Sequence, residues 1–369
     1  MLASERRKII LAAVRQHGAV KLADLVERLA VTPVTVRRDV TALADQGLVV
    51  RVHGGITLPH RPDSSDISTP SAHSAFGASA SRALVGMVAP SVEYYWPEVI
   101  QGAQSTVAAA RGRLVLRASS YDPAEDRRQV SKLLERGVQT LMVAPAVSGQ
   151  AGVDLLRWLG SLRIPVVLVE RVPPPELPTL ALDAVTTAHA LGAGLAVRHL
   201  VGLGHERVGL ITSRTSPTSR ALQQGWRDAV DDLGIPDPTS LATEVPRYGS
   251  EGWADAYAEV LRHYQRRGVS ALLVHSDREA VGIVELARDS GVAVPEELAV
   301  VSYDDEVAAA SDPPLSAVRP QKHRLGALAA ELALARLAEV TDRPVHRVQL
   351  WPTLHIRESC GAATGTVPE

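Results

Sequence analysis

From Ala83 onward, short apolar runs alternate with amphipathic segments, and this alternation constrains the fold more than any other feature of the chain. Strands that are apolar on both faces and separated by helices form parallel sheets covered by helices on both sides. The expected strands are ALVGMVAP, RLVLRAS, TLMVAP, IPVVLVE, RVGLIT, ALLVHSD and LAVVSYD. The expected helices between them include 97–110, 125–136, 186–201, 221–233, 252–267 and 278–290.

These strand–helix units are too numerous for one sheet of five or six strands, so the fold class is α/β with two lobes, each built on a parallel sheet. Ligands of such folds bind beyond the carboxyl ends of the strands, which places the expected site in a cleft between the lobes. Polar and aromatic residues gather near these strand ends and the starts of the following helices: Tyr94, Tyr95, Trp96, Glu170, Arg171, Arg220, Tyr248, Ser276, Asp277 and Asp304. Aromatic rings pack against the apolar faces of sugar rings, while carboxylates and guanidinium groups bind hydroxyls. The pattern therefore predicts a carbohydrate as the effector.

The N-terminal segment 31–55, VTPVTVRRDVTALADQGLVVRVHGG, predicts a short helix followed by a two-stranded tip. Thr32 is a suitable helix cap, and Pro33 suits the first helical position. Apolar residues at helical spacing mark the side that would face a core: Val36, Val40 and Leu43. Arginines, hydroxyls and one valine occupy the other side or its flanks: Val34, Thr35, Arg37, Arg38 and Thr41. A helix that presents such side chains suits the major groove of DNA.

The neighbouring segments complete a winged helix-turn-helix. Upstream, one helix is expected to bury Ile9, Ile10, Ala13 and Val14, and LADLVERLA forms the next. Downstream, VVRVHGGITL places Arg51 and His53 on one face of a wing, where they can lie along phosphates. Residues 1–58 contain nine Lys and Arg against five Asp and Glu, whereas the whole chain has a net charge of −2. The positive charge is concentrated where DNA is expected to bind.

Composition sets the remaining boundaries. Residues 59–82 are rich in Ser, Ala and Pro and lack periodicity, so they are expected to form a flexible linker between residues 1–58 and 83–369. Cys360 is the only cysteine, which excludes an intrachain disulfide. The N-terminus has no secretory signal pattern, and no apolar run is long enough to cross a bilayer, so we expect a cytoplasmic protein without membrane contact. No cofactor or metal is expected.

Two family resemblances rest on these residues. The arginine-arginine-aspartate helix and the histidine-glycine-glycine wing make residues 5–57 similar to the winged helix of DeoR-type regulators. Residues 83–359 resemble the effector domain of LacI-type repressors, a two-lobed fold of the periplasmic-binding-protein type (type I). The segments that carry this resemblance are RHLVGLGHERVGLIT, LARDSGVAVPEELAVVSYDD, DPPLSAVRPQKHRLG and LWPTLHIRES. It implies three crossings between the lobes, near 182–186, 315–319 and 349–353.

The LacI-type resemblance also implies roles for particular residues. It places Tyr95 and Trp96 at the family's ring-stacking pair and Asp304 at its ligand-bonding aspartate. The family's acidic-arginine pair matches Glu170 and Arg171, and its asparagine-aspartate pair matches Ser276 and Asp277, so that a glutamate and a serine replace the usual aspartate and asparagine. Two further positions depart from the family pattern. Leu222 stands where a pocket arginine is usual, with Arg220 nearby as a substitute, and Pro320 replaces a glutamine found in some sugar regulators.

The combined prediction is a ligand-responsive transcriptional regulator, a repressor, which binds operator DNA as a homodimer. The linker lacks the pattern of a hinge helix, so lobe closure and dimer geometry are expected to transmit the signal. An enzyme is the main alternative, but the chain has neither a phosphate-binding loop motif nor a serine nucleophile elbow, and no catalytic residues are expected. His199 and His205 are poorly spaced for a metal. A sugar-binding module without regulatory DNA binding is the second alternative.

Overall fold

The chain divides into two compact units, Met1–Gly77 and Ala78–Glu369. The computed structural model describes residues 83–235, 241–338 and 344–362 of the second unit. In the first unit it describes residues 6, 9–10, 13–14, 19–29, 31, 36, 40, 43, 50–52 and 55–57. The predicted linker, 59–82, lies outside these residues, so its bounds and those of the flanking domains stay predictions.

The first unit has a helical core and a small antiparallel sheet. The helix α2 (Leu22–Leu29) lies beside three strands in the order β1-β3-β2: β1 (Ala19–Lys21), β3 (Gly55–Thr57) and β2 (Val50–Val52). The pairing of β2 with β3 is the predicted wing, and β1 adds a third strand that the sequence pattern did not indicate. Helical residues from three segments form one buried cluster: Ile10, Ala13, Val14, Leu25, Leu29, Val36, Val40 and Leu43.

The expectation that Ile9 is buried with this cluster is wrong, because its side chain is 36% exposed. The buried stripe of this helix contains Ile10, Ala13 and Val14, at the spacing i, i+3, i+4. Ile9 lies one residue before this stripe, about 100° further around the helix from Ile10. The predicted helical faces are otherwise confirmed at the residues that the structure describes here.

The second unit contains two lobes. The N-terminal lobe has an entirely parallel sheet in the order β14-β8-β7-β6-β4-β5. Its strands are β4 (Leu84–Ala89), β5 (Arg113–Ala118), β6 (Thr140–Val143), β7 (Val166–Val169), β8 (Asp183–Thr187) and β14 (Arg347–Leu350). Its helices are α4 (Trp96–Ala109), α5 (Pro123–Glu135), α6 (Gly149–Gly160) and α11 (Lys322–Ala338). Every residue of β6 and β7 is buried, as expected for strands with helices on both faces.

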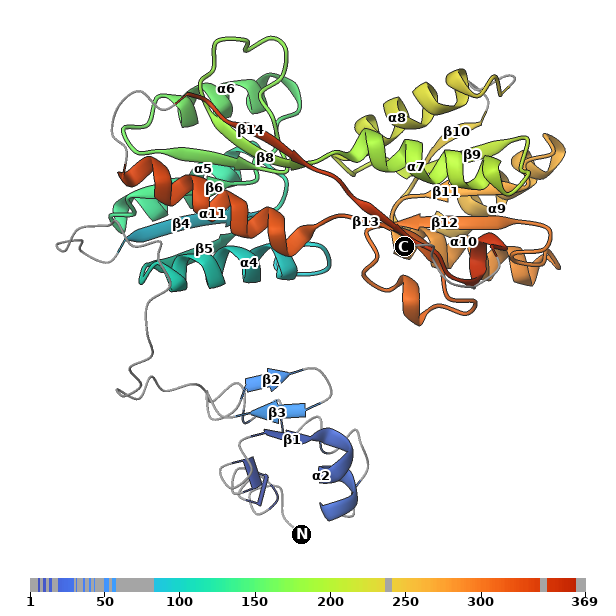
Figure 1. Ribbon diagram of the computed structural model, residues 1–369, viewed down its shortest axis with the longest axis horizontal. Coiled ribbons are helices and arrows are strands. Elements are labelled where there is room, and N and C mark those ends of the chain that lie inside the picture. The colour runs from blue at the N-terminus through green and yellow to red at the C-terminus, as the bar shows by residue number, and fades with distance from the viewer. Residues whose placement is uncertain are drawn as a thin grey trace. The chain divides into compact units, whose positions relative to one another are not determined.

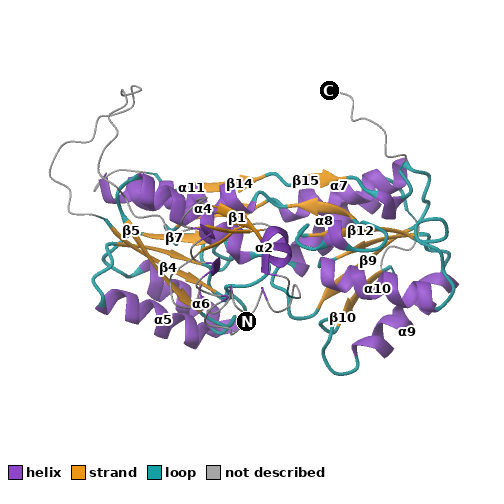
Figure 2. Cartoon of the chain, turned by 90° about the horizontal axis from the view of Figure 1, so that it is seen from below, coloured by secondary structure: helices purple, strands orange, loops and turns teal. Residues whose placement is uncertain are grey.

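The C-terminal lobe has the sheet order β10-β9-β11-β12-β13-β15, in which only β15 is antiparallel to its neighbour. Its strands are β9 (Val208–Ser213), β10 (Ala242–Val245), β11 (Ala271–Val274), β12 (Ala299–Tyr303), β13 (Ser316–Arg319) and β15 (Thr353–His355). Its helices are α7 (His189–Gly202), α8 (Ser219–Asp232), α9 (Trp253–Arg266) and α10 (Asp277–Asp289), with short 3₁₀ turns at Ala308–Ala310 and Glu358–Cys360. Figure 2 shows helices on both sides of the sheet in each lobe, which confirms the predicted α/β class.

The chain passes between the lobes three times. These crossings run from β8 to α7 through Ala188, from β13 to α11 through 320–321, and from β14 to β15 through 351–352. The C-terminal helix α11 therefore belongs to the N-terminal lobe, where it packs against α4 (Figure 1). Three covalent connections on one side of the lobes form a hinge around which a cleft can open and close.

Candidate functional site

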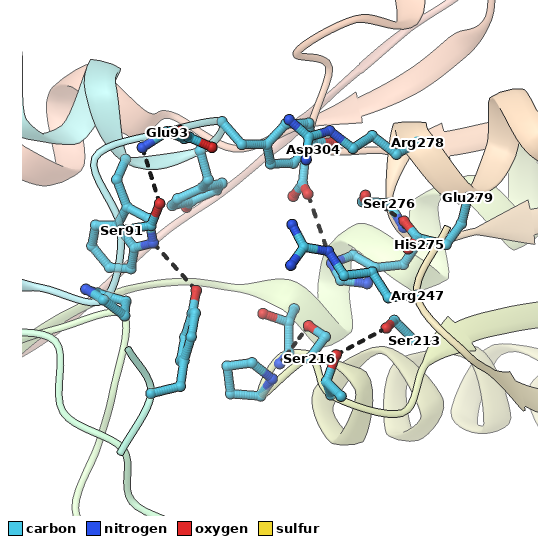
Figure 3. A pocket seen from close by; sticks show the side chains of 18 of the residues that line it. Ser91, Glu93, Ser213, Ser216, Arg247, His275, Ser276, Arg278, Glu279 and Asp304 are labelled. Carbon is cyan, nitrogen blue, oxygen red and sulfur yellow. Dashed lines mark hydrogen bonds and ion pairs between the residues drawn. The ribbon is translucent and has the colours of Figure 1, made fainter. Parts of the chain in front are cut away.

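A cleft of about 910 Å³ lies between the lobes, at the carboxyl ends of their parallel strands. The segments that follow eight strands line it: β4, β5, β7, β8, β9, β10, β11 and β12. Its lining residues are Pro90, Ser91, Glu93, Tyr94, Tyr95, Trp96, Ser119, Ser120, Tyr121, Glu170, Arg171, His189, Ser213, Arg214, Thr215, Ser216, Pro217, Thr218, Pro246, Arg247, Ser250, His275, Ser276, Arg278, Glu279 and Asp304. Figure 3 shows the side chains of 18 of these residues, which converge from both lobes. The volume is within the range of small-molecule sites.

The cleft brings together seven of the ten residues predicted to bind an effector: Tyr94, Tyr95, Trp96, Glu170, Arg171, Ser276 and Asp304. Tyr95 and Trp96 lie at the start of α4 with their ring centroids 5.6 Å apart, in an edge-to-face arrangement. Tyr94 reaches the opposite lobe, where its hydroxyl accepts a hydrogen bond of 3.2 Å from the backbone N–H of Asp277. Aromatic rings therefore form one wall, as the sugar prediction requires, and one of them already joins the lobes.

Glu170 follows β7 and contacts Thr187 and His189, the residues on either side of the first crossing. Its Oε1 accepts hydrogen bonds from the Tyr95 hydroxyl and from Thr187 Oγ1 (2.6 Å), and its Oε2 accepts one from the Thr187 backbone N–H (3.0 Å). His189 Nε2 lies 3.2 Å from Oε2. Burial opposes ionisation, but the charge of His189 and these hydrogen bonds outweigh it and lower the pKa of Glu170 to about 2.

His189 extends this network into the C-terminal lobe. Its Nδ1 lies 3.0 Å from the hydroxyl of Tyr303, the last residue of β12. Because His189 begins α7, directly after the first crossing, one imidazole ring contacts the strand ends of both lobes. The network therefore links the strand ends of the two lobes beside the first crossing.

Asp304 and His275 form a second, deeply buried pair on the C-terminal lobe. His275 Nε2 lies 3.7 Å from Asp304 Oδ2, and its Nδ1 has no hydrogen-bond partner among the described residues. Burial lowers the pKa of His275 to about 4, and burial reinforced by Asp277 raises the pKa of Asp304 well above its ordinary value. Both changes favour neutral side chains, each of which can donate one hydrogen bond and accept another.

The remaining three predicted effector residues do not line the cleft. The Asp277 carboxylate is fully buried and accepts hydrogen bonds from Ser302 Oγ (2.7 Å) and from two backbone N–H groups at 306 and 307 (2.5 and 3.0 Å). Tyr248 packs on Trp253, with ring centroids 4.5 Å apart, and its hydroxyl donates to Glu285 (3.3 Å). Through these contacts, Asp277 and Tyr248 stabilise segments next to the cleft.

Arg220 is exposed near the start of α8, outside the cleft lining. It does not replace the pocket arginine that Leu222 displaces, because two residues along a helix turn a side chain by about 200°. Leu222 itself is buried in the core of the C-terminal lobe. Guanidinium groups reach the cleft from other places, at Arg214, Arg247 and Arg278.

Several lining residues were not predicted from the sequence. His189 and His275 directly precede or follow strand and helix ends, but the apolar runs around them gave no separate polar signal. Arg247 and Arg278 lie next to residues that were selected. The strand-end rule finds these segments, but it does not determine which side chain of each loop faces inward.

The predicted DNA-binding residues fall almost entirely outside the described residues: Thr32, Val34, Thr35, Arg37, Arg38, Thr41 and His53. Arg51 is described only in its backbone, where it belongs to β2 and is paired in register with Ile56. Their contacts with DNA stay predictions.

Comparison with known proteins separates the same two parts. Residues 6–61 match the DeoR-like helix-turn-helix domain, and residues 197–360 match the periplasmic binding protein-like domain. An uncharacterised HTH-type transcriptional regulator in the aml 5′ region of Streptomyces limosus is 31% identical over 293 residues, which cover 76% of this chain and 79% of that protein. The chain belongs to the LacI-type family of transcriptional regulators. Its helix-turn-helix is of the DeoR type, as the sequence indicates.

Other transcriptional regulators are similar to this chain at lower identity. The arabinose metabolism transcriptional repressor of Geobacillus stearothermophilus is 23% identical over 88% of this chain and 86% of its own length. The crystal structure of a LacI family regulator from Enterococcus faecium with bound ribose is 20% identical, with a TM-score of 0.60, and the match covers 75% of this chain and 98% of that one. The fold of the effector domain is therefore that of LacI-type regulators.

The described residues lack two features that mark other classes of protein. None of the helices found there combines the length and the apolar character that a bilayer crossing needs. Within the same residues, no group of three or more His, Cys, Asp or Glu side chains is arranged to hold a metal ion.

Proposed function

We propose that this regulator represses transcription by binding operator DNA through residues 1–58, and that a sugar or sugar-like effector in the interlobe cleft changes its affinity for the operator. The observation that carries the proposal is the cleft itself, where polar and aromatic side chains from eight strand ends converge in a chain that also matches a helix-turn-helix domain. A sugar as the ligand class is supported by the names of two similar proteins, one an arabinose metabolism repressor and one crystallised with ribose.

The mechanism follows from the network between the lobes. An effector that contacts both walls favours the closed form, since it gains interactions there that the open form lacks. The hinge contacts of His189 with Glu170 and Tyr303 then adjust to the new angle. A coupling between effector and DNA of about 1–3 kcal/mol would change operator affinity by about 5- to 150-fold.

The proposed regulator acts in the cytoplasm as a homodimer and has no enzymatic activity. Two recognition helices that read half-sites separated by one turn of DNA must lie roughly 34–36 Å apart, a spacing that a dimer provides. A sedimentation experiment that finds a monomer both free and on DNA would contradict the homodimer.

Two substitutions test the division of labour. Arg38→Ala should reduce operator affinity by about 10-fold or more, because it removes an arginine predicted to contact DNA, and should leave effector binding intact. Asp304→Ala should remove the effector response while operator binding is retained. Fluorescence anisotropy with labelled operator, with and without effector, measures both. Loss of both functions in either folded variant would contradict the proposal.

A further inference from the structure

Unpaired positive charge lines the C-terminal side of the cleft. Arg214 follows β9, Arg247 follows β10, and Arg278 lies in the first turn of α10. Among the described residues, Arg214 and Arg247 have neither a hydrogen bond nor an ion pair from their side chains, and both are exposed. The guanidinium of Arg278 lies over the Tyr94 ring, 4.7 Å from its centroid. Figure 3 shows Arg247, Arg278 and Asp304 among the side chains that line the cleft.

The acidic side chains of the cleft do not neutralise these arginines. Glu170 is held by Tyr95, Thr187 and His189. The Glu279 carboxylate accepts hydrogen bonds from Ser276 N (2.9 Å), Ser276 Oγ (2.6 Å) and the backbone N–H of Tyr248 (3.2 Å). Burial favours the neutral form of Asp304, and Glu93 is exposed on the opposite lobe. The formal charges of the lining residues cancel, but the side chains free to bind a ligand are mainly cationic.

A hydroxyl-rich loop adds further donors beside the arginines. Residues 213–218, SRTSPT, line the cleft and lead into the N-terminus of α8, where the helix dipole favours an anion. The hydroxyls of this loop are those of Ser213, Thr215, Ser216 and Thr218. Hydroxyls and guanidinium groups together are the usual donors to phosphate and carboxylate oxygens.

Arg171 supplies an independent observation on the N-terminal lobe. Its side chain is only 8% exposed, and its Nη1 donates to the backbone carbonyl of Glu170 at 2.6 Å. Its Nε is buried and, within the described residues, has no acceptor. A buried donor without an acceptor costs free energy, so a ligand that offers an acceptor at this place is favoured.

From these observations we propose that the effector is an anionic sugar, either a phosphate ester or a sugar acid. Its anionic group lies against Arg214, Arg247 and Arg278, and its ring packs against the aromatic wall formed by Tyr95 and Trp96. The inference rests on the proposed function, since it assumes that the cleft takes a sugar, and it adds the charge of that sugar.

The test compares sugars that differ only in charge, by calorimetric titration of the full-length protein. The probes are glucose, glucose 6-phosphate and glucuronate; galactose, galactose 6-phosphate and galacturonate; and ribose with ribose 5-phosphate. In at least one set, an anionic member should bind about 10-fold or more tightly than its neutral parent, and its affinity should fall as salt is added. Preference for the phosphate or for the carboxylate distinguishes the two kinds of anion.

Substitutions locate the anionic group. Arg247→Gln and Arg278→Gln should each weaken binding of the anionic sugar about 10-fold and change binding of the neutral parent less than 2-fold, because they remove charge but leave Tyr95 and Trp96 to pack against the sugar ring. Arg278→Lys keeps the charge and should recover part of the loss. The matched control is Arg227→Gln, an exposed arginine of α8 that does not line the cleft, and it should bind as the unchanged protein does.

Two results would overturn the inference. A neutral parent that binds as tightly as its anionic partners would contradict the anionic class and leave the sugar-effector proposal intact. If no sugar of either kind binds, and inorganic phosphate raises the Tm equally in the unchanged protein and in Arg247→Gln, both proposals fail.

Discussion

Glu170 shows how one residue type can fit a predicted site and still have a different task. Its place after β7 predicted direct contact with an effector, and it does line the cleft. Its two carboxylate oxygens, however, are engaged by Tyr95, Thr187 and His189. Glu170 therefore positions the aromatic wall and the first crossing, while the buried Nε of Arg171 beside it has no acceptor among the described residues.

Glu170→Gln should destabilise the effector domain. The substitution replaces one carboxylate oxygen, which accepts hydrogen bonds, with an NH2 group, which would face the donors of Tyr95 or Thr187. The loss should depend on pH. A carboxyl group whose pKa falls from an ordinary 4.5 to about 2 in the folded state stabilises the fold above pH 4.5. This contribution is lost as the pH falls from 4.5 toward 2. The difference in urea unfolding between the unchanged protein and the variant should therefore be largest at pH 6 and shrink by pH 3.

The control for this effect is Glu93→Gln, which removes an exposed carboxylate from the same lobe and should change the free energy of unfolding by less than about 0.5 kcal/mol. A difference for Glu170→Gln that is constant from pH 6 to pH 3 would show that ionisation of Glu170 does not stabilise the fold.

The polar and aromatic residues at strand ends could be predicted from the sequence, but the directions in which their side chains point could not. Tyr94, Tyr95 and Asp304 follow strands and face the cleft, whereas Asp277 follows a strand and points into the protein to bind Ser302. Sequence position identifies the loop. The rotamer and the hydrogen bonds available within each loop decide which side chain faces the ligand.

At the scale of elements, two helices far apart in the sequence are held together through glycines. A Cβ atom at Gly326 of α11 would lie 1.8 Å from the carbonyl oxygen of Val99, and one at Gly102 of α4 would lie 1.9 Å from that of His323. The two backbones are thus in direct contact. This contact fixes α11, which follows the second crossing, against the N-terminal lobe.

Gly326→Ala should lower the free energy of unfolding by about 1–3 kcal/mol, because the added methyl group forces the α4 and α11 backbones apart. Urea unfolding followed by circular dichroism measures the change. The matched control is Gly202→Ala in the last turn of α7, where nothing lies within 4 Å of the added Cβ. There, alanine should be neutral or slightly stabilising. Equal effects of the two substitutions would contradict the close helix contact.

Strands with continuous apolar runs were predictable as elements, and so was the edge strand β5 (RLVLRA), whereas two less apolar edge strands were not. Runs such as TLMV and VVLV became β6 and β7, which are buried throughout. β10 (ATEV) and β14 (RVQL) lie at sheet edges and are only partly buried. An edge strand needs no continuous apolar run, so its sequence resembles that of a loop. β8 was partly assigned to the following helix, because the pattern does not mark where a strand turns into a crossing.

At the scale of the whole molecule, the chain joins a DeoR-like helix-turn-helix domain to a LacI-type effector domain. The order of the parts and the two-sheet architecture followed from sequence patterns, since each rests on periodicity over many residues. The proposed charge of the effector could not be predicted from the sequence. Arg214, Arg247 and Arg278 come from three separate segments, which only the folded lobe brings together.

The central claim is that cleft and operator are coupled, and a thermodynamic cycle measures this directly. Operator affinity is measured with and without the sugar that binds best, and the affinity for that sugar is measured with and without operator. Coupled sites require both affinities to change by the same factor, which we expect to be about 5- to 150-fold. A factor of one in both directions, with both ligands bound to the same folded protein, would contradict the account.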